Sequence, residues 1–574
     1  MPATPLRKLA SLALLAVLLT ACASLGDEPP ATHISAMPGL GDSSFKPTAQ
    51  DEQARQWFAQ GLQLAYAFEH REAVRVFRAA LARDPSCAMC AWGVAYALGP
   101  NINRSSRGPV PDIRRFIATA QKAAAGASPL ERALINAMAV RFGRADTKAQ
   151  AAYEAQGAAM CSSSKPDPES ERKVDPQDLG YAAAMADVLQ QFPDDPDVVT
   201  LYADAVMNTS PWRWWDAKTG QPKGRVADAF ARLAATTARH PRHTGALHFY
   251  VHLAEHSPEP RRAETAADLL GTVAPEAPHL VHMGSHVYKQ IGRFADGSRA
   301  NEQALAVQKR FDALLQAQGV ARSGRWDAHH LHFLWYAALM EGRSSLSLQT
   351  ARDYAQRFGK AGGSEGAYAQ LLPWVSLVRL QRWDAVLAEH VPAASSAPGQ
   401  GAELLQAYVA HARGLAQLHT GQLALAKTEL ATVERLQPLL KDATLWGGPT
   451  PPKMATLLQK KLAGAIARAE GRHEAAIALL RQAADLDDEL GNDPPMLGGG
   501  ARLTLAAALL AAGQLDEAQR EIQEAQRLNG PSTWVHLALA QLAERRGAQD
   551  EGSRQVALAK AAWRAADGAE LPRL

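Results

Sequence analysis

Cysteine is scarce in this chain, whose 574 residues include only four. Cys87 and Cys90 form a C-x-x-C pair, and no histidine follows Cys90, which excludes covalent attachment of a c-type haem. The pair also lacks the second pair of cysteines that a structural zinc site of this type needs. Cys87 and Cys90 are therefore a candidate disulfide in an oxidising compartment. A redox pair, a metal role and incidental thiols remain open, with Cys161 as the odd thiol.

An excess of one charge sign is absent as well. Lys and Arg number 61 against 58 Asp and Glu, which leaves a formal net charge of +3. No basic stripe stands out, and this argues against nucleic acid as a partner. The sequence has no serine-hydrolase elbow, no Walker phosphate loop, no HExxH and no dinucleotide-binding glycine pattern. Enzyme classes that depend on these motifs are therefore excluded.

Long apolar runs are confined to the N-terminus. Arg7 and Lys8 precede the run Leu9–Leu19, which has the length of a signal-peptide core and is too short to cross a bilayer. The run ends in Leu-Thr-Ala-Cys at Cys22, which resembles the lipobox of bacterial lipoproteins. We therefore expect residues 1–21 to be a signal peptide and Cys22 to carry acyl chains that hold the protein at a membrane.

The residue after Cys22 is Ala23. In lipoproteins of this kind an Asp at that position favours retention in the inner membrane. Its absence predicts an anchor in the outer membrane, with the protein facing the periplasm.

The composition of the remaining residues indicates a tether, two helical arrays and a linker. Residues 22–50 are rich in Pro, Gly and Ser and have no apolar period, which predicts a flexible tether. The remainder is rich in Ala, Leu, Gln and Arg and favours helix. A second segment rich in Pro and Ser, residues 391–401, predicts a linker between an N-terminal array (51–390) and a C-terminal array (402–574).

Small residues recur at fixed offsets that are typical of tetratricopeptide repeats. In the first unit, Gly61 and Ala73 stand where two helices of a pair cross closely, and Pro85 ends the unit. The same offsets return in units that contain Gly414, Gly464, Ala506 and Ala540, and the turn Gly292-Arg293-Phe294 fits a central repeat. The pattern predicts an all-α solenoid whose helix pairs stack into a right-handed superhelix with a concave groove.

Histidine is concentrated near the centre of the chain. Eight of the 18 histidines lie between His240 and His286. Three segments carry histidines three or four residues apart, a spacing that places them on one face of a helix. The candidate metal ligands are His248, His252, His282, His286, His329 and His332. Glu255 and Glu341 are nearby carboxylates that can act as ligands or accept hydrogen bonds from them.

Two interpretations of these histidines remain open. Pairs at i and i+4 chelate one metal ion, and imidazole suits Zn, Cu, Ni or Fe. The other interpretation is a hydrogen-bonded polar core, or a groove for a polar or anionic ligand. The sequence does not decide between them.

Several longer motifs carry a resemblance to a known family. They are Phe58–Phe77 (FAQGLQLAYAFEHREAVRVF), His240–Glu255 (HPRHTGALHFYVHLAE), His279–Phe294 (HLVHMGSHVYKQIGRF) and His329–Arg343 (HHLHFLWYAALMEGR). The chain resembles large bacterial tetratricopeptide-repeat proteins with a histidine-rich centre, a family without a settled activity. Gly284 stands where similar proteins usually have Pro, and residues 496–501 (MLGGGA) replace an aromatic-Pro stretch.

Three functions follow from these features. The first is a lipid-anchored helical-repeat protein that binds a protein, peptide or small ligand in its groove, with or without a histidine-bound metal. The second is a metalloenzyme that uses the central histidines, and the third is a non-catalytic scaffold for envelope assembly.

Overall fold

The computed structural model describes most of the chain. The described residues are Ala31 and 33–42, 44–103, 109–143, 175–216, 219–320, 326–361, 363–391, 401–441, 445, 450–491, 493–568 and 570–573. The predicted signal peptide, Cys22 and Cys161 lie outside them. The described part contains 24 α-helices, three short 3-10 helices and no β-strand, and one isolated bridge joins Trp215 to Pro222. The protein is an all-α protein of the tetratricopeptide-repeat type, as the sequence predicts.

The helices form two compact units, which are described separately. Unit 1 lies within Met1–Ala158 and Val174–Thr209, and unit 2 lies within Ala159–Lys173 and Ser210–Leu574. The division thus falls after Thr209. The predicted linker at 391–401 belongs to unit 2, and its residues 392–400 are outside the described residues.

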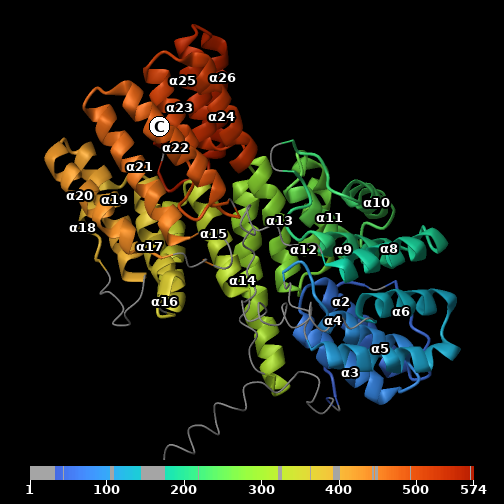
Figure 1. The fold of residues 1–574 in the computed structure, drawn as a ribbon. Coiled ribbons are helices and arrows are strands. Elements are labelled where there is room, and N and C mark those ends of the chain that lie inside the picture. The colour runs from blue at the N-terminus through green and yellow to red at the C-terminus, as the bar shows by residue number, and fades with distance from the viewer. Residues whose placement is uncertain are drawn as a thin grey trace, which may run out of the picture. The chain divides into compact units, whose positions relative to one another are not determined.

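The α-helices described in unit 1 pack in chain order, each against the next (Figure 1). They are α2 (Glu52–Tyr66), α3 (His70–Arg83), α4 (Ala88–Leu98), α5 (Val110–Ala123), α6 (Pro129–Phe142), α8 (Pro176–Gln191) and α9 (Pro196–Thr209), with a 3-10 turn at Ala124–Gly126. Phe77 of α3 lies between two glycines. A Cβ atom added at Gly61 of α2 would be 2.8 Å from the Phe77 ring, and one added at Gly93 of α4 would be 2.6 Å from it. The three helices approach this closely because neither glycine has a side chain.

The second half of the predicted tether is packed rather than exposed. Ile34, Met37, Leu40 and Phe45 are buried, and the Phe45 ring lies 5.5 Å from the ring of Phe58. These apolar residues are separated by Pro and Gly and so show no helical period, which is why composition alone indicated a tether. The expectation of flexibility is therefore wrong for this part of residues 22–50.

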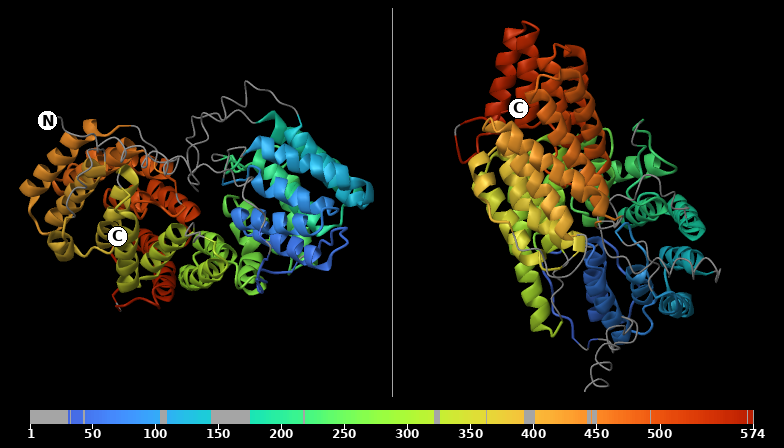
Figure 2. Two further views of the ribbon diagram at one scale, coloured as in Figure 1. Left: turned by 90° about the horizontal axis from the view of Figure 1, so that it is seen from below. Right: turned by 60° about the vertical axis from the view of Figure 1, so that its left-hand side comes forward.

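The helices of unit 2 also pack in chain order (Figures 1 and 2). The first eight are α10 (Val226–Arg239), α11 (Thr244–Glu255), α12 (Glu264–Val273), α13 (Pro278–Ile291), α14 (Phe294–Ala317), α15 (Asp327–Glu341), α16 (Ser344–Phe358) and α17 (Gly363–Arg379). The others are α18 (Trp383–Ala388), α19 (Gly401–His419), α20 (Leu423–Leu436), α21 (Pro451–Ala469), α22 (His473–Glu489), α23 (Ala501–Ala511), α24 (Leu515–Asn529), α25 (Thr533–Arg545) and α26 (Gln549–Ala562). Short 3-10 turns lie at Pro260–Ala263 and Gln437–Leu439.

The four C-terminal helix pairs repeat one turn. Gly421, Gly471, Gly513 and Gly547 each follow the first helix of a pair with φ values of 77°, 74°, 76° and 74°. A residue with a side chain is strained at such φ values, and glycine is not. The recurrence confirms the repeat units that the sequence predicts in this part of the chain.

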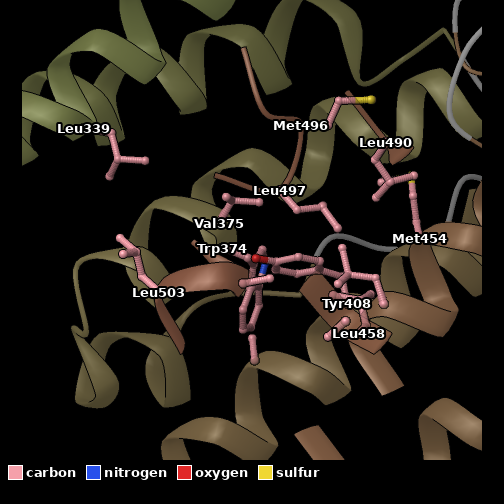
Figure 3. Close-up of a cluster of buried hydrophobic side chains, with 14 of the residues drawn as sticks. Leu339, Trp374, Val375, Tyr408, Met454, Leu458, Leu490, Met496, Leu497 and Leu503 are labelled. Atoms are coloured by element: carbon pink, nitrogen blue, oxygen red, sulfur yellow. The ribbon is translucent and has the colours of Figure 1, made fainter. Parts of the chain in front are cut away.

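The segment between α22 and α23 is anchored in the hydrophobic core of unit 2. Met496 and Leu497 are buried among core side chains that include Trp374 and Tyr408 (Figure 3). The Tyr368 hydroxyl donates a hydrogen bond of 3.0 Å to the carbonyl oxygen of Met496. This segment carries Asp493, and the anchors fix where that carboxylate lies.

Among the described helices, none combines the length and the apolar character needed to cross a membrane.

Candidate metal centre

Helices α11, α13 and α15 of unit 2 bring their histidines together. Helix α13 packs against both α11 and α15, and the spacing of three or four residues turns the imidazoles of each helix to the shared side. Two groups of three imidazoles result. Cluster A consists of His248, His252 and His279, and cluster B consists of His282, His286 and His329. Within each cluster, one ring nitrogen from every residue lies within 4.8 Å of the other two.

Cluster B has the tighter geometry. The Nε2 atom of His286 lies 2.9 Å from Nε2 of His282 and 3.4 Å from Nε2 of His329. Ligand bonds of about 2.0–2.1 Å in a tetrahedral site place two nitrogens roughly 3.3 Å apart. His282 and His286 are buried, whereas His329 is half-buried, so the cluster reaches the surface on the side of His329. The 3.4 Å contact matches this separation and the 2.9 Å contact is shorter, and all three nitrogens lie within 4.8 Å of one another, so the three imidazoles are grouped closely enough to hold one metal ion.

The hydrogen bonds of His282 fix its tautomer. Asn301 of α14 donates through Nδ2 to the carbonyl oxygen of Gly297, so its Oδ1 atom faces His282. This oxygen is 2.6 Å from Nδ1 of His282 and can only accept. Nδ1 of His282 therefore carries the hydrogen, and Nε2 of the neutral ring presents a lone pair to cluster B.

His286 is oriented by two carboxylates. Its Nδ1 atom lies 2.5 Å from Oε2 of Glu255 and 3.4 Å from Oδ1 of Asp493. Burial lowers the pKa of His286, but the negative charges of Glu255 and Asp493 outweigh burial and raise this pKa to about 10. Nδ1 of His286 is thus a donor, and its Nε2 faces the lone pair of His282 at 2.9 Å. A positive charge, either a proton or a metal ion, must lie between these two nitrogens.

The remaining imidazoles of cluster B are neutral at pH 7. Burial first, and then the neighbouring histidines His329, His330 and His286, hold the pKa of His282 well below its usual range. Burial and His286 also lower the pKa of His329, to about 4. Neutral imidazole is the form that binds metals.

Cluster A lies on the other side of Glu255. Nε2 of His248 is 3.2 Å from Nε2 of His279, and the ring centroids of His248 and His252 are 4.7 Å apart. Nδ1 of His252 lies 2.7 Å from Oε1 of Glu255. One carboxylate therefore accepts a hydrogen bond from a histidine of each cluster.

Aromatic rings enclose both clusters. Trp326 stacks on His279 with ring centroids 4.0 Å apart, and Phe333 lies 4.5 Å from the ring of His286. Trp212 meets His252 edge-on at 5.5 Å. These contacts limit the movement of the imidazoles, which favours a preformed site.

The structure gathers five of the six histidines that the sequence selects and places the sixth elsewhere. His332 lies 2.6 Å through Nε2 from the hydroxyl of Tyr368, the same hydroxyl that holds Met496. It therefore supports the segment that carries Asp493 and belongs to neither cluster.

Of the two glutamates that the sequence indicates, only Glu255 lies at the histidines. Glu255 contacts both clusters, whereas Glu341, at the C-terminal end of α15, accepts a hydrogen bond from Ser298 and pairs with Arg343 at 3.6 Å. The expected contact of Glu341 with the histidines is thus wrong, because it lies three helical turns beyond His329 on α15.

The sequence selection leaves out three residues of the site. His279 is three residues before His282, and that spacing is a signal that the sequence offers. Asn301 and Asp493 have no such signal, because each comes from a segment without histidine and reaches the site only through the packing of unit 2.

In unit 1, Cys87 and Cys90 are joined by a disulfide at the start of α4. Both residues are fully buried.

No protein-family model and no curated protein matches the chain. Among solved structures, the chain is similar to yeast Tom70, with 12% identity over 89% of this chain and 95% of that one and a TM-score of 0.26. It is similar to Naa15/Naa10 bound to HypK-THB, with 10% identity over 90% and 89% of the two chains and a TM-score of 0.22. For the tetratricopeptide domain of P58(IPK) the identity is 11% over 88% and 99%, with a TM-score of 0.21. The fold class of this chain rests on its own helices.

Proposed function

We propose that this protein is an exported, lipid-anchored helical-repeat protein that binds a transition-metal ion at cluster B. The observation that carries the proposal is the 2.9 Å contact between Nε2 of His282 and Nε2 of His286. The opposite nitrogens of both rings face oxygen acceptors, so this contact requires a cation between the rings. A metal ion meets that requirement and also uses the third imidazole, His329.

Charge favours a divalent ion. Burial raises the pKa of Glu255 and of Asp493, but the neighbouring His286 outweighs burial and lowers both, so both carboxylates are negatively charged. When both ring nitrogens of His286 are protonated, the buried group of His286, Glu255 and Asp493 therefore carries a net charge of −1. A divalent ion in place of the Nε2 proton makes the group neutral. Imidazole ligands suit Zn, Cu, Ni and Fe, so these metals are the candidates.

The test is elemental analysis of the full-length protein, extracted in detergent and purified without a histidine tag. After dialysis against Cu or Zn and then against buffer, we expect at least one tightly held equivalent. The double variant His282→Gln/His329→Gln should hold one equivalent fewer, because it removes two of three imidazoles.

His411→Gln is the matched control. His411 is a buried histidine of α19 whose Nδ1 lies 3.0 Å from the carbonyl oxygen of Leu458, outside both clusters. The control should keep the full metal content. A folded wild-type protein that takes up no metal would refute the proposal.

Binding is supported better than catalysis. A catalytic metal site needs a base near the open coordination position, and the candidate beside His286 is Oδ2 of Asp493, which has no hydrogen-bond partner among the described residues. Although burial raises the pKa of Asp493, His286 outweighs it and holds this pKa below the usual range, so the carboxylate is a weak base. We therefore propose a carrier or sensor of metal, with a metalloenzyme as the alternative.

The envelope location rests on the N-terminal sequence. The lipobox-like Leu-Thr-Ala-Cys ending at Cys22 supports acylation and an outer-membrane anchor. Cys22→Ser should prevent incorporation of labelled palmitate and release the protein from the membrane fraction. Labelling that persists in this variant would contradict the anchor.

A second candidate function is binding of a peptide or protein. A groove of about 810 Å³ lies over α14, α15 and α16, with Leu305 and Leu346 beside the charged Arg352 and Asp353. A photo-crosslinking residue at Gln349 in this groove should capture the partner in cells, and the same residue at the exposed Gln316 of α14 should not. Equal capture at both positions would argue against the groove.

A further inference from the structure

We propose that cluster A binds a second metal ion, so that the protein holds a pair of three-histidine sites linked through Glu255. This inference rests on the proposed function of cluster B. Cluster A shares no ligand with cluster B, and its imidazoles come from α11 and α13.

The geometry of cluster A repeats that of cluster B. The Nε2 atoms of His248 and His279 are 3.2 Å apart, close to the separation of roughly 3.3 Å that a tetrahedral ion imposes. His252 completes the set, with its ligand nitrogen within 4.8 Å of the other two. All three side chains are at most 2% exposed, so the ligand atoms face a closed interior.

Glu255 orients one imidazole in each cluster. Its Oε1 atom accepts from Nδ1 of His252, and its Oε2 atom accepts from Nδ1 of His286. A ring that donates through Nδ1 in its neutral form has its lone pair on Nε2. The carboxylate therefore turns Nε2 of His252 to cluster A and Nε2 of His286 to cluster B. Such carboxylate–histidine pairs are common partners of metal sites.

The two sites are close neighbours on the same helices. The ring centroids of His252 and His286 are 5.9 Å apart, as are those of His279 and His282. Trp212 and Trp326 hold His252 and His279 from outside. The two ions thus occupy neighbouring sites, of which cluster A is enclosed and cluster B reaches the surface at His329. Both suit metals that bind three imidazoles, and copper and zinc are the probes.

The experiment counts metal ions per chain. Full-length protein is loaded with Zn or Cu, dialysed and analysed for metal, and the number of imidazoles per metal is measured by X-ray absorption. We expect two equivalents with three imidazoles each. His248→Gln/His279→Gln should retain one equivalent, as should His282→Gln/His329→Gln, while His411→Gln should retain two.

The outcomes separate this inference from the proposed function. One equivalent in the wild type that is unaffected by His248→Gln/His279→Gln overturns the second site and leaves cluster B standing. No metal in the wild type overturns both. If the double variant loses its helical content, the single variant His248→Gln replaces it, and we expect at least a tenfold weaker second equivalent in a chelator competition.

Glu255→Gln tests the link between the sites. Loss of the shared acceptor should weaken both equivalents by about 10–100-fold, the range found when such partners are removed. Glu341→Gln changes another buried glutamate of unit 2, outside the clusters, and should leave both affinities unchanged. A Glu255→Gln variant in which only one affinity falls would overturn the link.

Discussion

At the scale of single residues, His282 and His286 show how neighbours set charge. The two lie one turn apart on α13, and burial lowers the pKa of each. His286 faces Glu255 and Asp493, which raise its pKa to about 10, whereas His282 faces an amide oxygen and other histidines. In the absence of metal, His286 is charged and His282 is neutral, although both are histidines of the same helix.

Asp204 of unit 1 shows the opposite case, a carboxylate whose burial is not compensated. Burial raises its pKa from 3.8 to about 6, although Arg141 and hydrogen bonds from Tyr96 and Asn208 act in the other direction. A carboxyl group whose pKa is higher in the folded state binds more protons when folded. Its contribution to stability is therefore fully present below the unfolded value of 3.8 and is lost as the pH rises through about 6.

We accordingly expect Asp204→Asn to stabilise unit 1 at pH 8 relative to the wild type. A shift of about two pKa units corresponds to ~3 kcal/mol, which is the upper limit of the gain. Thermal unfolding followed by circular dichroism between pH 4 and 8 measures the difference, which should vanish near pH 4. Asp187→Asn, at an exposed position of α8, should change little at any pH. A variant that becomes less stable than the wild type as the pH rises would contradict the assignment.

At the scale of helices, close crossings at glycine determine how the pairs stack. Phe77 of α3 has Gly61 on one side and Gly93 on the other, so its ring cannot move away from one without meeting the other. Gly93→Ala should therefore lower the unfolding free energy of unit 1 by about 1–3 kcal/mol, the usual cost of overpacking.

Chemical denaturation measures this cost, and the neighbouring side chain supplies a check. Combining Gly93→Ala with Phe77→Leu should give a smaller loss than the sum of the two single variants, because the narrower leucine leaves room for the added methyl group. Gly126→Ala, where an added Cβ would meet nothing within 4 Å, is the control. If the losses from the two substitutions simply add, the close contact between Phe77 and Gly93 does not cause the destabilisation.

The sequence predicted the helix pairs well because their signal is local. Small residues at fixed offsets marked α2/α3 and the four C-terminal pairs, and histidine spacing marked the shared face of α11 and α13. The sequence-based prediction failed for residues whose partners are set by tertiary packing. Asp493 reaches His286 from more than 200 residues away, and no local period indicates that contact. His332 fits the helical spacing as well as His329 does, but the packing of α17 gives it Tyr368 as a partner.

At the scale of the whole molecule, the chain keeps the candidate site within one of its two units. Every member of clusters A and B, together with Glu255, Asn301 and Asp493, belongs to unit 2. Unit 1 contains the Cys87–Cys90 disulfide and a hydrophobic core around Phe77. The candidate site and the core around Phe77 therefore lie in different units.

This separation predicts where metal acts on the dynamics of the protein. On loading the chelator-treated protein with metal, amide hydrogen exchange should slow in α11, α13 and α15 and in the segment around Asp493, because ligation cross-links these elements. Exchange in α2 to α9 should not change. Equal slowing in both units would mean that the metal acts outside the clusters. Protection of the three helices without the Asp493 segment would instead mean that this carboxylate does not take part in holding His286 once the metal has replaced the proton.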